Sequence, residues 1–227
     1  MVRTTWDPVR GIEVSADEWE VNNKGKPGRC SICDNDIYIK ANSAPAVSTH
    51  FAHRAGSNCP SVNNNRESYE ILQPIYKDYR NAKQLKKSLL NNMEIVYQKC
   101  RSIFGENGFK RSDFQKLIRA GSDKNIWLYK DMTMKYLPYV LLVNYGVFQK
   151  EEHRKRKVYF VFDAKLSSYE DLWIRPGKIK QKLWRVYPEE SLIEKVEIDF
   201  DTSLLSPDYF IFYATGLQKL ENDFLKW

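Results

Sequence analysis

The stretch that decides the fold begins with Cys30-Ser-Ile-Cys33 and continues through His50-Phe-Ala-His53 to Cys59. Three of the four cysteines and two of the three histidines of this 227-residue chain lie within it. Thiolates and imidazoles, arranged as a Cys-x-x-Cys pair and a later His/Cys group, suit tetrahedral zinc at a ribbon-like spacing. We therefore predict a structural zinc site with five candidate ligands, Cys30, Cys33, His50, His53 and Cys59.

Five candidates compete for four positions, so one of His50, His53 and Cys59 is expected not to bind. The alternatives are a redox-active Cys-x-x-Cys, which would need no His-x-x-His partner, and cysteines that only pack. Cys100 is left as a single thiol, which favours a reducing compartment over a disulfide scaffold. No apolar N-terminal region or run of transmembrane length is present, so we expect a cytoplasmic protein that does not associate with membranes.

The N-terminal stretch is predicted to be a small β-ribbon over residues 1–62. Residues 3–22 alternate apolar and polar and are predicted as a strand and a turn, and further strands are predicted at 36–40 and 49–53. Such a module contains too few apolar residues to hold itself together, which is a physical reason for a metal ion.

Residues 66–227 are predicted to form a second domain that mixes strands and helices, of α/β or α+β class. The helical period predicts a helix over 66–90. Further helices are predicted at 112–120, with a serine cap and Gly121 as its stop, within 168–181, and at 217–227. Strands are predicted at 93–97, 137–145, 157–163, 193–200 and 209–213, with the basic segment 151–157 as the tip of a hairpin.

Asp163-Ala-Lys165, at the end of a predicted strand, is the set that suits catalysis. Residues two apart project to the same side of a strand. The carboxylate suits Mg²⁺ and the lysine suits activation of a water for phosphodiester attack. The alternative is a solvated strand end, because the triplet is short and common by chance.

Several stretches together resemble the competence protein CoiA-like family. They are Gly11-Ile-Glu-Val-Ser-Ala16, the Cys-x-x-Cys pair, the segment His50 to Cys59, and Arg66-Glu67-Ser-Tyr-Glu70. The resemblance implies an N-terminal zinc finger coupled to a PD-(D/E)xK-type nuclease domain. It also implies that residues 137–143 form the strand that carries the first metal-binding aspartate, and that 160–165 belong to the second-motif strand.

The chain departs from that family at Pro138-Tyr139, where the family has Pro-Asp. A tyrosine cannot replace a carboxylate at a magnesium site. Glu67 and Glu70, on the helix before, are candidates for a further acid, and a solvated helix face is the alternative. Asp131 could substitute only if the chain doubles back.

A local excess of positive charge points to a polyanionic partner. Residues 66–227 carry 29 basic and 22 acidic residues, which accounts for the whole net charge of +7. Cations neutralise phosphates, and exposed indoles stack on unpaired bases, whereas the alternative is a solvated loop with its tryptophans in the core. The predicted nucleic-acid contacts are Arg154, Lys155, Arg156, Lys157, Trp173, Arg175, Lys178, Lys180, Lys182 and Arg185.

Three hypotheses follow from the sequence. The first is a zinc-containing protein that binds nucleic acid, DNA in preference to RNA, through a nuclease-like domain with a degenerate catalytic site. The second is an active nuclease that uses Mg²⁺ or Mn²⁺ with Asp163, Lys165 and Glu67. The third is a non-enzymatic module, such as an inhibitor, that binds a protein partner.

Overall fold

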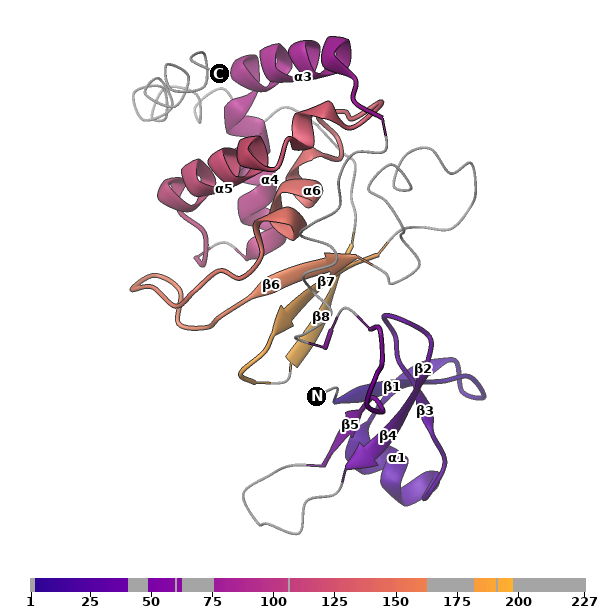
Figure 1. Cartoon of the computed structure of the whole chain (residues 1–227). Helices are drawn as coiled ribbons and strands as arrows, with labels where there is room; N and C mark the ends of the chain where they lie inside the picture. Colours follow the sequence, from indigo (N-terminus) through magenta and orange to yellow (C-terminus); the bar gives the residue numbers. More distant parts are fainter. Residues whose placement is uncertain are drawn as a thin grey trace.

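The computed structural model describes residues 3–40, 49–59, 61–62, 76–105, 107–162, 182–190 and 192–197. In this part of the chain, helices are combined with two antiparallel sheets, which confirms the mixed α+β class. Figure 1 shows the N-terminal sheet at one end, a layer of helices at the other, and the second sheet between them.

The N-terminal sheet has five strands in the spatial order β2-β1-β3-β4-β5. Their bounds are β1 Thr4–Asp7, β2 Ile12–Ser15, β3 Gly28–Arg29, β4 Asp36–Lys40 and β5 His50–Ala52. All neighbouring pairs are antiparallel. The strands predicted at 36–40 and 49–53 are therefore confirmed as β4 and β5.

Helix α1 (Ala16–Asn22) replaces the turn predicted at the end of residues 3–22. The hydroxyl of Ser15 accepts a hydrogen bond from the N–H of Glu18 at 3.1 Å, which caps the helix. Trp19 is buried at 6.3 Å from the ring of Phe51, whereas Val21 is 82% exposed. Trp19 and Val21 are two residues apart, which is the spacing of one face of a strand, but in a helix such residues lie on different sides, so only Trp19 is buried.

The helical layer consists of α3 (Tyr79–Asn91), α4 (Met93–Phe104), α5 (Arg111–Asp123) and α6 (Leu137–Tyr145), with a 3-10 turn, η2 (Ile126–Leu128). The helix predicted over 66–90 is confirmed from Tyr79 onward, and its first part lies outside the described residues. The strand predicted at 93–97 is wrong, because these residues begin α4 with an apolar face packed into the core.

The strand predicted at 137–145 is also wrong, because this segment is α6. All its residues from Leu137 to Asn144 are buried, so the run is apolar on every side and shows no period that separates strand from helix. Pro138 stands in its first turn, where a proline favours a helix start. The first-motif strand implied by the CoiA-like resemblance is therefore not formed by residues 137–143.

Helix α5 was predicted over 112–120 and is present with different ends. It begins at Arg111 after Lys110 rather than after a serine cap, and it continues past Gly121 to Asp123. A Cβ at Gly121 would lie 2.8 Å from Leu141 of α6. The glycine therefore allows α5 and α6 to pack closely and does not end the helix.

The second sheet has the strand order β6-β7-β8, with β6 Tyr159–Phe162, β7 Lys182–Tyr187 and β8 Leu192–Glu197. β6 and β8 confirm the strands predicted at 157–163 and 193–200. β7 was missed, because its cations suggested a loop. Residues 137–145 are a helix, so they form no hairpin with β6, which pairs with β7 instead. A shorter hairpin with its tip in the predicted basic segment is present, with antiparallel bridges between Phe148 and Val158 and between Glu151 and Arg154.

This second sheet is a middle layer with both faces buried. Phe160, Phe162 and Leu183 belong to the core of the helical layer. The alternate residues belong instead to the core of the N-terminal sheet, and they are Tyr159, Val161, Trp184 and Val186. Burying a large apolar side chain contributes about 1.5–3 kcal/mol to the free energy of folding. The N-terminal sheet is therefore stabilised by packing on the second sheet as well as by its candidate metal site.

The predicted elements at 168–181, 209–213 and 217–227 lie outside the described residues. Within the described ranges, none of the helices has the length and apolar character to cross a membrane.

Candidate metal centre

Cys30 and Cys33 lie in a tight turn between β3 and β4. The N–H of Cys30 donates to the carbonyl of Asn35 at 2.9 Å, and the N–H of Asp34 donates to the carbonyl of Cys30 at 2.8 Å. Asp34 has a φ of 60°, the left-handed conformation that asparagine and aspartate tolerate in turns. This turn presents both thiols to one point.

The second arm of the site comes from β5 and the loop after it. β5 is antiparallel to β4 and ends one residue before His53. The Nε2 atom of His53 lies 3.3 Å from Sγ of Cys33, and Sγ of Cys59 lies 3.9 Å from Sγ of Cys30. All four ligand atoms lie within 4.8 Å of one another. Zinc bound tetrahedrally, with Zn–S of about 2.3 Å and Zn–N of about 2.0 Å, separates its ligand atoms by about 3.5–3.8 Å, so the four residues fit zinc.

His50 is the candidate that does not join the cluster. It lies on β5 opposite Lys40, three residues before His53, and strand residues rise by about 3.3 Å each. Its side chain is buried within the N-terminal sheet, with 8% of the residue exposed. The sequence left the choice among His50, His53 and Cys59 open, and in the structure it is His53 and Cys59 that lie with Cys30 and Cys33.

The charges inside the quartet are strongly coupled. Hydrogen bonding from Cys30, then from Cys59 and His53, and from the backbone N–H of Asn35 lowers the pKa of the Cys33 thiol far below its ordinary value. The same cysteine contacts raise the pKa of Cys30. Burial lowers the pKa of His53, but contacts with Cys33 and Cys59 outweigh burial and raise it to about 9. These groups therefore share protons that a metal ion displaces when it binds.

The site is closed, which is the form of a structural zinc centre. Cys30 is 2% exposed and Cys59 is fully buried, and the four protein ligands leave no open position for a substrate. The Oγ atom of Ser61 lies 3.1 Å from Sγ of Cys59, and the carbonyl of Ser61 accepts a hydrogen bond from the hydroxyl of Tyr159 at 3.1 Å. The ligand loop is thus tied to β6.

The redox alternative has less support from this geometry. Sγ of Cys30 lies beside Cys59 as well as beside Cys33, so the Cys-x-x-Cys thiols do not form an isolated pair. All three are free thiols. Cys100 is fully buried on α4, where burial raises its pKa well above the ordinary value of a thiol. A buried neutral thiol of this kind is inert.

The basic segment 154–157 is largely neutralised by acids that are distant in sequence. The Nε atom of Arg156 lies 3.0 Å from Glu190, and Nζ of Lys157 lies 3.3 Å from Glu189, both on the turn after β7. Only Lys155 in this segment is exposed with no ion pair seen among the described residues. The fold thus supplies neutralising acids to a segment that the sequence predicts to bind nucleic acid.

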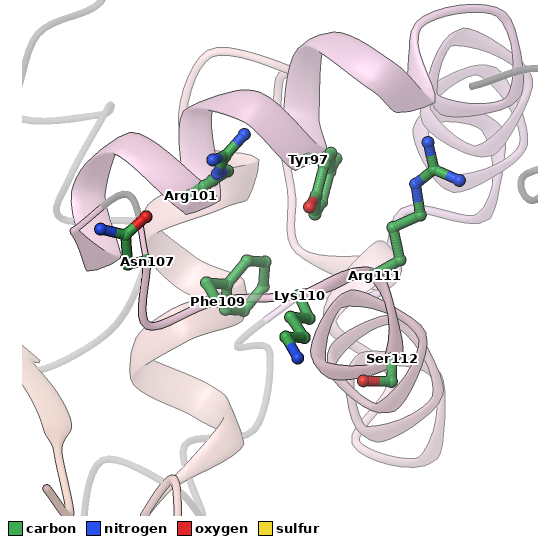
Figure 2. Close-up of a pocket in the computed structure, with 7 residues that line it drawn as sticks. All are labelled: Tyr97, Arg101, Asn107, Phe109, Lys110, Arg111 and Ser112. Carbon is green, nitrogen blue, oxygen red and sulfur yellow. The ribbon is translucent and has the colours of Figure 1, made fainter. Parts of the chain in front are cut away.

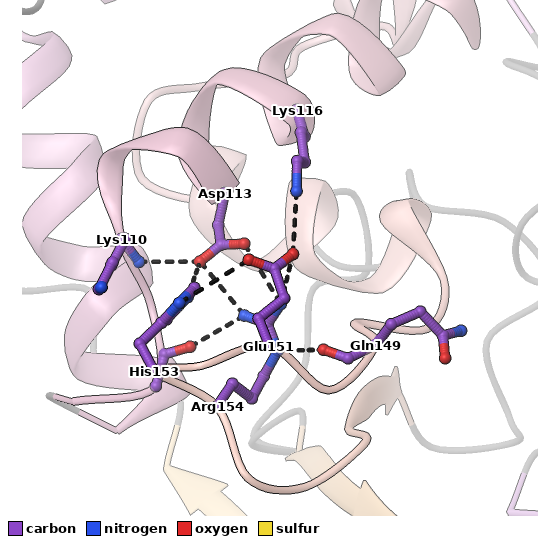
Figure 3. Close-up of polar contacts among 8 residues, drawn as sticks. Lys110, Asp113, Lys116, Gln149, Glu151, His153 and Arg154 are labelled. Carbon is purple, nitrogen blue, oxygen red and sulfur yellow. Dashed lines mark hydrogen bonds and ion pairs between the residues drawn. The ribbon is translucent and has the colours of Figure 1, made fainter.

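Arg154 is withdrawn from the predicted nucleic-acid surface, because its guanidinium is buried in the polar cluster of Figure 3. Its Nε donates to the carbonyl of Gln149 at 2.7 Å, and its other nitrogens reach the carbonyl of Gly108 at 3.0 Å and Asp113 at 3.3 Å. Nε2 of His153 lies 2.8 Å from the same carboxylate. These contacts of His153 and Arg154 with Asp113, called the clasp below, fix the turn before β6 to the start of α5.

Asp113, Glu151 and His153 also lie close enough to share a metal ion. Arg154 pairs with both carboxylates, and Lys116 pairs with Glu151 at 2.9 Å. Cations of the protein thus already occupy the positions that a metal would take, so we interpret the group as structural. No local pattern in the sequence indicates this group, because Asp113 lies about 40 residues before Glu151 and His153.

Arg185 is likewise engaged in the fold. Its guanidinium donates to Glu194 at 2.8 Å across the β7–β8 pair, and to the carbonyl of Phe104 at the end of α4 at 2.6 Å. Lys182 is exposed at the start of β7. The remaining predicted nucleic-acid contacts lie outside the described residues, and they are Trp173, Arg175, Lys178 and Lys180.

The predicted catalytic residues, Asp163, Lys165 and Glu67, also lie outside the described residues. Tyr139, at the position of the family's first aspartate, is buried in α6 and is 1% exposed. Among the described residues, nothing supports a Mg²⁺ or Mn²⁺ site beyond the neutralised group around Asp113.

Comparisons of the chain with protein-family models, with curated proteins and with solved structures find no match. The resemblance to the CoiA-like family therefore stays a prediction.

A long basic region in the helical layer was missed. Residues 76–135 contain 14 lysines and arginines against six acids. Two of those acids, Glu94 and Asp113, are buried. A charge count along the chain in windows would have found this region, because here the cations are spread along helices rather than gathered in one run.

Proposed function

We propose that this chain is a zinc-stabilised protein that binds nucleic acid through its helical layer. The carrying observation is the charge of residues 76–135, with 14 basic and six acidic residues. An excess of positive charge attracts polyanions, and phosphate contacts supply most of the affinity of sequence-independent binding. The closed Cys3His quartet holds the N-terminal module in place and takes no part in chemistry.

The test is binding of labelled single- and double-stranded DNA and RNA to the zinc-loaded full chain at several salt concentrations. The logarithm of the binding constant should fall linearly with the logarithm of the salt concentration, because each neutralised phosphate releases counterions. Affinity that stays flat with salt would contradict the proposal and favour a protein-interaction module. DNA is expected to bind more tightly than RNA.

The nuclease hypothesis is kept as a second candidate on one observation. β6 ends at Phe162, so Asp163-Ala-Lys165 follows a buried strand directly in the sequence, as in the second motif of PD-(D/E)xK enzymes. The loss of the first-motif strand to α6 weakens it. Incubation of DNA with the protein and Mg²⁺ or Mn²⁺ tests it: cleavage that disappears in Asp163→Ala supports an enzyme, and intact DNA rejects one.

A further inference from the structure

The helical layer contains a hollow of about 520 Å³ where α4 approaches the start of α5. Figure 2 shows Arg101 on α4, Lys110 before α5 and Arg111 in its first turn arranged around it. Tyr97 and Phe109 line the same hollow, and both are at least 95% buried. The hollow is therefore an open basin with an apolar base and a cationic rim.

Three cations and no acid are found among the described residues that line this basin. Asn107 and Ser112 add an amide and a hydroxyl, both exposed. Burial raises the pKa of Glu94 and outweighs the opposite effect of Arg111, and Glu94 is buried and does not line the basin. The lining thus favours an anion that accepts several hydrogen bonds.

The loop between α4 and α5 is held from behind by the polar anchors already described. Arg185 donates to the carbonyl of Phe104, and Arg154 donates to the carbonyl of Gly108. The N–H of Lys110 donates to Asp113 at 2.9 Å. Because these bonds fix the backbone that carries Phe109 and Lys110, the basin loses little conformational entropy when a ligand binds.

We propose that this basin binds the phosphate of a nucleoside phosphate, free or within a nucleic-acid strand. A single phosphate is much smaller than the basin, whereas ligand pockets of about 300–1,000 Å³ suit nucleotide-sized molecules. The rim cations bind the phosphate, and the nucleoside covers the apolar base. Where the phosphate belongs to a nucleic-acid strand, the inference rests on the proposed function. It then places the contact with the strand at α4 and the start of α5.

The experiment measures binding of a fluorescein-labelled single-stranded DNA of about 20 nucleotides, long enough to cover one site. It compares the zinc-loaded full chain with the double variant Arg101→Gln/Arg111→Gln. The matched control is Lys24→Gln/Lys26→Gln, which removes two exposed charges from the N-terminal module. AMP is titrated separately, and a melting curve and zinc content verify that each variant is folded.

We expect the basin variant to bind the strand at least about tenfold more weakly than the control, with a salt slope shallower by about 2 than in the wild type. An equal loss of affinity in both variants overturns the inference and leaves the proposed function standing. AMP binding that depends on Arg101 and Arg111, without binding of the strand, supports the basin and overturns the proposed function. Absence of binding to both ligands overturns both. If the double variant does not fold, Lys110→Gln, at an exposed position, replaces it in the same comparison.

Discussion

At the residue scale, the four-ligand choice separates His53 from His50. Both are histidines in one His-x-x-His pair, and spacing alone does not distinguish them. The register of β5 against β4 carries His53 past the end of the strand to the thiols and keeps His50 inside the sheet. A candidate metal ligand and a buried histidine of the sheet therefore lie three residues apart.

We predict that His53→Ala loses zinc to a chelator far more readily than the wild type, because only three ligands remain. His50→Ala should keep its zinc and melt at a lower temperature, since it leaves a buried space worth about 1–3 kcal/mol. Zinc release to a coloured chelator and a melting curve measure the two effects. Equal zinc loss in both variants would show that His50 is a ligand.

The sequence was informative about the candidate metal site because its residues are close in the chain and their spacing is the one that zinc requires. It misled at Arg154 and Arg185, which appear in basic runs but are bound by partners far away in sequence. The same holds for Arg156, whose neutralising Glu190 is visible only after β6 and β7 are paired. A local charge count measures composition and does not show which cations form ion pairs with distant acids in the folded chain.

At the scale of secondary-structure elements, the pattern of buried and exposed residues decides which elements the sequence predicts correctly. α6 was mistaken for a strand because an element buried on all sides carries no amphipathic period. β7 was missed because two cations interrupt its apolar residues. Lys182 is exposed at the start of the strand, and Arg185 is partly exposed in its middle. Elements with one exposed face, such as α5 and β4, were predicted correctly.

We predict that Gly121→Ala destabilises the protein by about 1–3 kcal/mol, because the added methyl overpacks the contact between α5 and α6. The new Cβ would meet Leu141 at 2.8 Å and Ile126 at 2.9 Å. Chemical denaturation measures the change. In a Leu141→Ala background the added methyl should cost less, and an equal cost there would place the strain elsewhere.

The clasp at the start of α5 predicts a dependence of stability on pH. Burial raises the pKa of Asp113, but the Lys110 N–H, Arg154 and His153 outweigh it and hold the pKa below its ordinary value. The carboxylate therefore stabilises the fold above the unfolded pKa of about 3.9, and this stabilisation is lost as the pH falls through the lower folded value.

Asp113→Asn should consequently lower the melting temperature most near pH 6–7, and the difference from the wild type should shrink below about pH 4. Asp123→Asn, at an exposed position on the same helix, controls for the loss of one carboxylate. A difference for Asp113→Asn that stays constant down to low pH would contradict the clasp.

At the scale of the whole molecule, the second sheet joins the N-terminal sheet, which carries the candidate metal site, to the helical layer. One face of β6 and β7 packs on each side, and the ligand loop reaches β6 through the bond between Ser61 and Tyr159. Removal of zinc should therefore destabilise more than the N-terminal sheet, because the face of the second sheet that carries Val161 and Trp184 would become exposed to solvent.

We predict that stripping zinc with a chelator lowers the melting temperature, shifts tryptophan fluorescence to longer wavelength and increases binding of a hydrophobic dye. Re-addition of zinc should reverse all three. Tyr159→Phe should cost about 0.5–1.5 kcal/mol while zinc binding persists, because one hydrogen bond is lost. Unchanged melting and fluorescence after complete metal removal would contradict a structural role for the ion.

The most direct measurement is zinc X-ray absorption on the natively purified chain, combined with elemental analysis. The structure predicts one zinc ion per chain with three sulfur ligands at about 2.3 Å and one nitrogen at about 2.0 Å. Three sulfurs correspond to Cys30, Cys33 and Cys59, and the nitrogen to His53. A shell with two nitrogens, or protein that contains no zinc, would contradict the account.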